Sequence, residues 1–136
     1  PSMPSTTGPS TRNAATTLDR YFTLSDTAGH SQTDFEELIG LFAPDAVLEP
    51  ATGPSVRGAA QIRAFFRTFL DRNAESRHLW RTRVDDSEPG TVTVEWAVAV
   101  RRSAGGLAAM TGTDVAALAP DGRIARLRVA MEGRRP

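Results

Sequence analysis

Residues 91–102 read TVTVEWAVAVRR, and this stretch decides the fold class. Large apolar side chains occupy every second position, at Val92, Val94, Trp96, Val98 and Val100. Polar residues such as Thr93, Glu95 and Arg101 lie among the positions between them. Because successive side chains of a strand point to opposite faces of a sheet, this period of two predicts a strand with one apolar face.

The same period continues on both sides of this stretch. It predicts four long strands, over residues 76–84, 91–102, 107–119 and 124–132. Turn sequences separate them, at Glu88-Pro89-Gly90, Gly105-Gly106 and Pro120-Asp121-Gly122. Since short turns join antiparallel neighbours, we expect the C-terminal half of the chain to form an antiparallel sheet.

Before residue 76 the apolar residues recur with the helical period, and three helices are predicted. Their limits are marked by Ala14 and Ala28-Gly29, by Thr33 and Pro44, and by Gly58 and Asn73. For the second helix, Thr33 with Glu36 three residues later has the pattern of a capping box. Residues 46–49 predict a brief extended segment that Pro50 closes.

This order of elements indicates an α+β fold, in which three N-terminal helices pack in a strongly curved antiparallel sheet. A sheet bent over helices encloses a cone-shaped cavity unless core side chains fill it, and we expect the functional site there. The length of 136 residues and the apolar content of 40% suit a single domain, which we place at residues 14–132. Residues 1–13 are rich in proline and hydroxyl groups and are expected to form a flexible tail, and residues 133–136 a frayed end.

The composition excludes several kinds of chemistry. There is no cysteine, all 16 basic residues are arginine, and the histidines are His30 and His78. A thiolate nucleophile, a lysine Schiff base, a lysine-containing phosphate loop and a three-histidine zinc site are therefore impossible. Sixteen acidic residues balance the arginines, so net charge favours neither nucleic acid nor an anionic membrane as a partner. We expect a cytoplasmic protein that uses no metal or organic cofactor and binds a small molecule.

Asp114 is the most informative acidic residue. On its predicted strand it shares a face with small or apolar residues, namely Met110, Gly112, Ala116 and Leu118. Burying an ionised carboxyl group is costly, so this aspartate is expected to be protonated or to have a hydrogen-bond donor. A protonated carboxyl group can donate a hydrogen bond to a developing oxyanion. The other face of the strand is also rather apolar, so the pattern leaves open whether Asp114 points to the core or to water.

Glu49 and Tyr21 are two further candidates. Glu49 lies directly before Pro50 and shares a face of the extended segment with Val47. It is either a general base in the cavity, with a raised pKa, or an exposed residue at the end of a strand. Tyr21 lies on the apolar face of the first helix, where its phenol either donates to a substrate carbonyl or is a core group bonded to the backbone.

Aromatic and apolar residues of the third helix and the sheet are predicted to line the cavity. They are Phe66, Phe69, His78, Trp80, Trp96 and Met110. His78 and Trp80 alternate onto one face of the strand 76–84, where a buried histidine is either structural or catalytic. Such a lining suits an apolar substrate.

Four parts of the chain together resemble a known family. They read RYFTLSD at 20–26, LFAPDAVLEP at 41–50, VRG at 56–58 with IRAFF at 62–66, and TDV at 113–115 with DGRI at 121–124. The order of these parts resembles the ketosteroid isomerase and SnoaL-like polyketide cyclase branch of the nuclear transport factor 2-like superfamily. The resemblance covers residues 14–132 and implies an α+β cone and, commonly, a homodimer.

The resemblance also implies roles for three residues. By position, Tyr21 and Asp114 would be oxyanion donors and Glu49 the base, as in the ketosteroid isomerases. Glutamate replaces the usual aspartate at the base position, and the run Thr111-Gly112-Thr113-Asp114 is similar to the SnoaL-like cyclases, so a steroid substrate does not follow.

We therefore expect an enzyme that isomerises or cyclises a ketone or polyketide-like substrate by proton transfer alpha to a carbonyl. The first alternative is an epoxide-opening cyclase or hydrolase on the same fold. The second is a module that binds a ligand or dimerises without catalysis.

Overall fold

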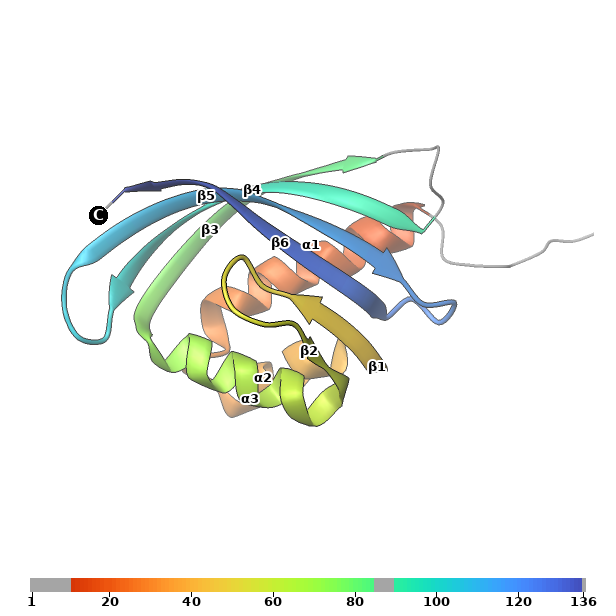
Figure 1. Cartoon of the computed structure of the whole chain (residues 1–136), viewed down its shortest axis with the longest axis horizontal. Helices are drawn as coiled ribbons and strands as arrows, with labels where there is room; N and C mark the ends of the chain where they lie inside the picture. The colour runs from red at the N-terminus through yellow and green to blue at the C-terminus, as the bar shows by residue number, and fades with distance from the viewer. Residues whose placement is uncertain (1–10, 85–89, 136) are drawn as a thin grey trace, which may run out of the picture.

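Three helices and six strands make up residues 11–84 and 90–135, the part of the chain that the computed structural model describes. The helices are α1 (Thr11–Thr27), α2 (Gln32–Gly40) and α3 (Gly58–Asp71). The strands are β1 (Phe42–Glu49), β2 (Val56–Arg57), β3 (Asn73–Val84), β4 (Thr91–Arg102), β5 (Leu107–Leu118) and β6 (Ile124–Arg135). The curved sheet lies over the helices, which all pack on its concave side (Figure 1). The α+β prediction is therefore confirmed.

The six strands form one sheet in the order β2-β1-β6-β5-β4-β3. Strands β3 to β6 are an antiparallel meander, and their registers extend almost the full length of each strand. Strand β1 runs parallel to β6 and carries β2 on its other side, antiparallel. Because β2 and β3 are the two edges of this order, the sheet is curled but does not close into a barrel.

The boundary between α2 and β1 differs from the prediction. The N-cap of α2 is Ser31, whose side chain accepts a hydrogen bond of 3.1 Å from the backbone N–H of Asp34, and not Thr33. The helix ends at Gly40, and β1 already begins at Phe42. Pro44 therefore lies inside a strand instead of ending a helix, in the stretch between Phe42 and Val47 where the register with β6 shifts.

The predicted ends of the domain also need adjustment. Of the tail expected at 1–13, residues 1–10 lie outside the described part of the chain, whereas 11–13 belong to α1. Residues 133–135, expected to fray, continue β6. In the predicted turn at 88–90, Glu88 and Pro89 fall outside the described residues, but the hairpin itself is confirmed by the pairing of β3 with β4.

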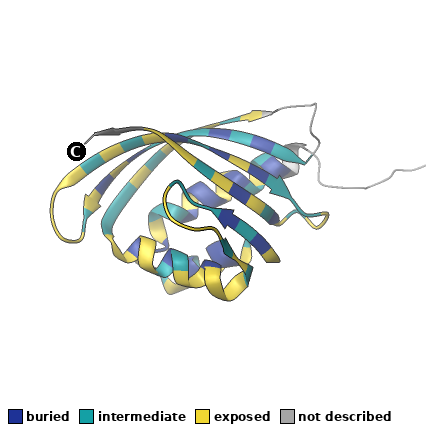
Figure 2. Ribbon diagram, in the orientation of Figure 1, coloured by how far each residue is buried: buried dark blue, intermediate teal, exposed yellow. Residues whose placement is uncertain are grey.

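The core lies between the concave face of the sheet and the helices. On β4 the predicted inner residues Val92, Val94, Val98 and Val100 are at most 8% exposed. Val92 and Val94 belong to the same core cluster as Leu18 of α1, whereas Val98 and Val100 line a cavity. Figure 2 shows this alternation of buried and exposed positions along the strands. Each such side chain contributes about 1.5–3 kcal/mol when it is fully buried, so the period of two fixes which face of the sheet covers the helices.

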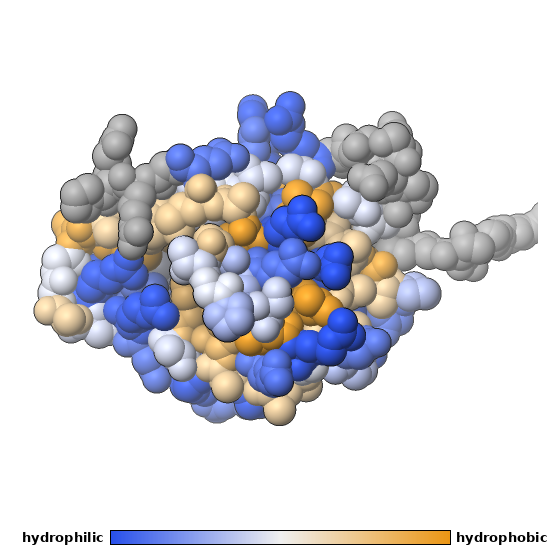
Figure 3. All heavy atoms as spheres, viewed as in Figure 1, coloured by the Kyte–Doolittle hydropathy of each residue, from blue (hydrophilic) through white to orange (hydrophobic). Residues whose placement is uncertain are grey.

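The outer face of the sheet carries paired charges beside exposed apolar residues such as Leu79 and Leu107. Glu95 on β4 accepts hydrogen bonds from Arg81 and Arg83 on β3, at 2.6 and 3.0 Å. Figure 3 shows hydrophilic residues next to hydrophobic ones across one face of the molecule. Among the helices described, none has the length and apolar character needed to cross a bilayer.

Candidate active site

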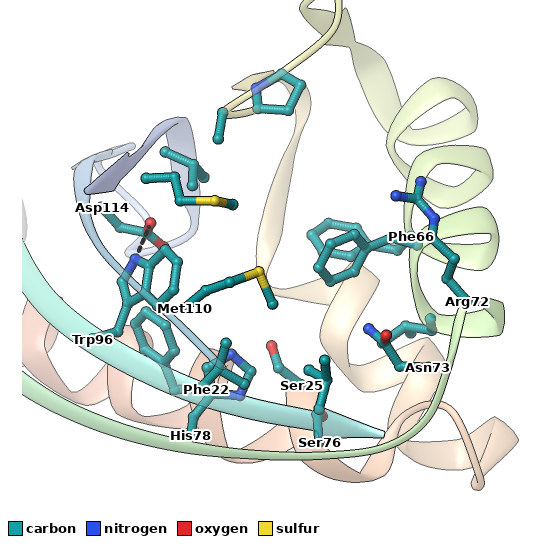
Figure 4. A pocket seen from close by; sticks show the side chains of 18 of the residues that line it. Phe22, Ser25, Phe66, Arg72, Asn73, Ser76, His78, Trp96, Met110 and Asp114 are labelled. Atoms are coloured by element: carbon teal, nitrogen blue, oxygen red, sulfur yellow. Dashed lines mark hydrogen bonds between the residues drawn. The ribbon is translucent and has the colours of Figure 1, made fainter. Parts of the chain in front are cut away.

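A cavity of about 210 Å³ lies between the concave face of the sheet and helices α1 and α3 (Figure 4). Most of its wall is apolar. Five of the six predicted lining residues take part in this wall, namely Phe66, Phe69, His78, Trp96 and Met110. The cavity is therefore built from the inner face of the meander and the apolar stripe of α3, as the two periodicities indicated.

Trp80, the sixth, packs on α1 instead of lining the cavity. Its ring stacks on Phe22, with centroids 5.5 Å apart and an interplanar angle of 21°. Its indole N–H donates a hydrogen bond of 2.9 Å to Oδ1 of Asp19 on α1. The predicted face of β3 is right, but Trp80 lies where β3 crosses the helix, two residues beyond the cavity wall.

Asp114 lies on the inner face of β5 and is 2% exposed. This settles the choice between the two faces of the strand, because its side chain lines the cavity. The indole N–H of Trp96 donates a hydrogen bond of 2.8 Å to Oδ1 of Asp114. Burial raises the pKa of Asp114 to about 7, although the Trp96 hydrogen bond works in the opposite direction. Near neutral pH this carboxyl group can therefore both give and take a proton.

Gly112 makes room for the indole that contacts Asp114. A Cβ atom at position 112 would meet the Trp96 ring and the carbonyl oxygen of Ala130, with Cε2 of the indole only 2.8 Å away. Gly112 pairs with Trp96 across β4 and β5, so a side chain there would enter the space that the ring fills. Close packing, and not an unusual backbone conformation, thus requires glycine at this position.

Tyr21 belongs to the core cluster and also lines the cavity, and it is 8% exposed. Its ring makes edge contacts with Phe22, Phe42 and Phe66, at centroid distances of 5.0, 6.1 and 6.2 Å. Burial, and then the negative charge of Asp114, raise the pKa of Tyr21 well above its ordinary value of 10.0. Its phenol stays protonated and can donate a hydrogen bond into the cavity.

Glu49 does not take part in the cavity wall. Its carboxylate lies 3.0 Å from Nε of Arg128 and 3.4 Å from Nε of Arg126, both on β6. Leu48, which is 1% exposed, takes the inner position of β1. The sequence correctly placed Glu49 and Val47 on one face, but this is the outer face, so the prediction that Glu49 is the base in the cavity is wrong.

Asp26 and His78 form a pair that the sequence analysis did not predict. Nδ1 of His78 lies 2.6 Å from Oδ1 of Asp26, and the backbone N–H of His78 donates to Oδ2 at 3.0 Å. Ser76 donates a third hydrogen bond, of 3.2 Å, to Oδ1. Burial raises the pKa of Asp26, but these hydrogen bonds outweigh it and hold that pKa below its ordinary value. The available signal was the place of Asp26 on α1, one turn after the apolar residue Phe22.

The opposite end of the cavity is polar. Arg102 donates a hydrogen bond of 2.9 Å to Oδ1 of Asn73, and both residues line the cavity together with Arg72. Figure 4 shows Arg72 and Asn73 near α3, across the cavity from Asp114. Residues 50–52, in the loop between β1 and β2, form a further part of the cavity wall. Within the described ranges, no group of three acidic or histidine side chains is arranged to hold a metal ion.

Comparisons with known proteins agree with this architecture. The sequence profile of the SnoaL-like domain matches residues 18–127. An NTF2-like protein of unknown function from Exiguobacterium is 29% identical, with a TM-score of 0.78, over 85% of this chain and 98% of that one. A sequence search of curated proteins gives no match.

Two more distant solved structures share the fold at 18% identity. One is SalBIII, an epoxide hydrolase/cyclase-like enzyme with a role in pyran ring formation in the polyether salinomycin. Its TM-score is 0.73, over 89% of this chain and 92% of that one. A Mycobacterium tuberculosis protein in complex with estradiol-17β-hemisuccinate has a TM-score of 0.72 over 86% of this chain and 92% of its own.

Proposed function

The chain belongs to the SnoaL-like domain family of the NTF2-like superfamily, and from this membership and its cavity we propose that it is a small-molecule enzyme working by acid–base chemistry. The proposed reaction isomerises or cyclises an apolar ketone or polyketide-like substrate by moving a proton alpha to the carbonyl. The observation that carries the proposal is Asp114, a carboxyl group with a pKa of about 7 in the wall of an apolar cavity. Such a group is costly to bury and is suited to proton transfer near neutral pH.

Asp114 and Tyr21 have complementary parts in this reaction. Oδ1 of Asp114 already accepts the hydrogen bond from the Trp96 indole, so in this proposal Oδ2 carries the exchangeable proton and faces the substrate. A substrate carbonyl that accepts hydrogen bonds from this Oδ2–H and from the Tyr21 phenol gains stabilisation as its oxygen becomes an enolate. Donors fixed in a water-poor cavity supply on the order of 3 kcal/mol each to such a charge.

A second candidate reaction uses the same carboxyl group as a base. Ionised Asp114 would remove the proton from a hydroxyl group or water that opens an epoxide, and one solved structure with this fold is named as epoxide hydrolase/cyclase-like. Labelled solvent oxygen in the product would distinguish hydrolytic opening from isomerisation, which incorporates solvent hydrogen. The third candidate, ligand binding without catalysis, is disfavoured because the cavity wall holds a buried carboxyl group whose hydrogen-bond donor, Trp96, carries no charge.

A homodimer is the assembly that we propose. Leu79 and Leu107 are 77% and 73% exposed on the sheet, and a partner would cover such large apolar side chains. Size-exclusion chromatography with light scattering measures the assembly directly. A monomer at all concentrations tested would contradict this part of the proposal.

The proposed reaction can be tested with a simple ketone. β-Tetralone is apolar and bicyclic and exchanges its alpha protons with deuterium oxide, which proton NMR follows. We expect wild-type protein to accelerate this exchange and Asp114→Asn to lower the catalysed rate by ~10²-fold or more. Glu95→Gln, on the outer face, is the matched control and leaves the rate unchanged. Exchange at the buffer rate with wild-type protein would refute the proposed reaction.

A further inference from the structure

We propose that His78 is the general base of the proposed reaction and that Asp26 is the residue that positions it. This inference rests on the proposed function and deepens it, because it identifies the group that removes the proton alpha to the carbonyl. The need for such a group follows from the position of Glu49, which is bonded to Arg128 outside the cavity. Asp114 then remains free to act on the oxygen of the substrate.

The geometry holds the His78 ring in one orientation. Asp26 accepts hydrogen bonds from both the backbone N–H and the ring of His78, at 3.0 and 2.6 Å, so the main chain and the side chain are fixed by one carboxylate. The two side chains are 14% and 17% exposed. Phe22 packs against the same ring, with centroids 5.6 Å apart. The ring therefore forms a rigid part of the cavity wall.

The Asp26 carboxylate also selects the tautomer of His78. An ionised carboxylate can only accept hydrogen bonds, so the proton of a neutral His78 ring must be on Nδ1. The unprotonated nitrogen is then Nε2, which has no hydrogen-bond partner among residues 11–84 and 90–135. A histidine that lines a cavity with a free, unprotonated Nε2 has the form that a general base requires.

Trp96 separates this base from the acid. Its ring meets the His78 ring at a centroid distance of 6.4 Å, and its N–H is bonded to Asp114. Figure 4 shows His78 and Asp114 on either side of Trp96, all at the same cavity. A flat ketone that lies against the indole would thus have its carbonyl oxygen near Asp114 and its alpha carbon toward His78.

The proton and electron movements balance without a further reactant. Nε2 of His78 takes the proton from the alpha carbon, and the electron pair of the broken C–H bond forms the enolate. Asp114 and Tyr21 donate hydrogen bonds to the enolate oxygen, while Asp26 stabilises the imidazolium. His78 then returns the proton to another carbon of the same conjugated enolate, which moves the double bond.

The test compares two histidine and two aspartate variants in the β-tetralone exchange. We expect His78→Gln to lower the catalysed rate by ~10²-fold and Asp26→Asn by ~10-fold or more, since the amide disfavours the proton on Nδ1. His30→Gln and Asp19→Asn are the controls, because His30 bonds the backbone of Ala74 and Asp19 bonds Trp80. If wild-type protein and Asp114→Asn behave as expected but His78→Gln is as fast as wild type, the base assignment is wrong while the proposed function stands.

A spectroscopic measurement decides the role independently of turnover. Nitrogen-15 NMR of the imidazole rings is expected to show the Nδ1–H tautomer of His78 in wild-type protein and its loss in Asp26→Asn. β-Naphthol, which imitates a flat enolate, should shift the Nε2 signal of His78. A wild-type ring protonated on Nε2, or an Nε2 signal that β-naphthol leaves unchanged while it perturbs Trp96, would overturn the proposal even if exchange were absent.

Discussion

The indole N–H of Trp96 on β4 donates a hydrogen bond of 2.8 Å to Oδ1 of Asp114 on the neighbouring strand β5. A single neutral donor stabilises the carboxylate less than its burial destabilises it, so the pKa of Asp114 is raised to about 7. The pair therefore keeps a carboxyl group buried and orients it, while leaving it able to change protonation state near neutral pH.

Removing the indole donor should raise the pKa of Asp114 further. Trp96→Phe eliminates the N–H that favours the ionised form, whereas burial of the carboxyl group persists. We expect the pKa to move above about 7, as measured by carbon-13 NMR titration of the carboxyl carbon. Trp80→Phe is the control, because Trp80 donates to Asp19 and not to Asp114. A pKa that falls in Trp96→Phe would contradict this account of the shift.

Asp114 should also make stability depend on pH. Its pKa is about 7 in the folded protein against an ordinary 3.8, so over this interval the folded state holds a proton that the unfolded state has released. The free energy of unfolding therefore decreases as pH rises through this window, by on the order of 4 kcal/mol at most. Urea denaturation at a series of pH values should show that Asp114→Asn lacks this decrease. If the free energy of unfolding changed with pH in the same way in wild type and Asp114→Asn, burial of the ionised Asp114 carboxylate would not carry the proposed cost.

Glu49→Gln is expected to have little effect on either activity or stability. The side chain of Glu49 is 25% exposed and its carboxylate pairs with Arg126 and Arg128, whose side chains are 54% and 62% exposed. Ion pairs that water reaches contribute about 1 kcal/mol or less. The β-tetralone exchange rate should match wild type within error, in contrast to Asp114→Asn. Loss of β-tetralone exchange in Glu49→Gln would show that Glu49 takes part in the reaction after all.

Gly112→Ala should destabilise the protein through the Trp96 ring. The added methyl group overlaps the indole and the backbone of Ala130, so the ring must move, at a cost of about 1–3 kcal/mol in urea denaturation. Gly40→Ala is the matched control, because among the described residues no atom outside its own helical turn and chain neighbours lies within 4 Å of a Cβ atom there. Equal stabilities of the two variants would mean that the indole is not held where the hydrogen bond to Asp114 requires it.

The sequence predicted the sheet well because one face of each long strand is covered. The period of two placed Val94 inside and correctly allowed Asp114 to share an inner face, although it could not choose between the two faces of β5. Which face of β5 is buried depends on where the helices pack, and the pattern of the strand itself does not contain that information. Cavity residues such as Phe66 and Met110 followed from the same two periodicities.

The errors concern contacts between distant parts of the chain. Glu49 has its bonding partner 79 residues away, on a strand that runs parallel to β1, and no local pattern reveals which face of so short a segment is covered. Asp26 and His78 are 52 residues apart, so their pairing depends on how α1 crosses β3. Pro44 predicts the end of a helix because proline can continue neither a helix nor a regular strand ladder. In the structure it lies within β1, at the place where the register with β6 shifts.

The loop between β1 and β2 has an evolutionary consequence. Residues 50–52 cover the cavity but belong to neither β3, β4 nor β5, which carry His78, Trp96 and Asp114. Insertions or deletions in this connection can therefore enlarge or shrink the chamber while the reactive groups keep their places. Homologues are expected to diverge in substrate size by varying the length of this one connection.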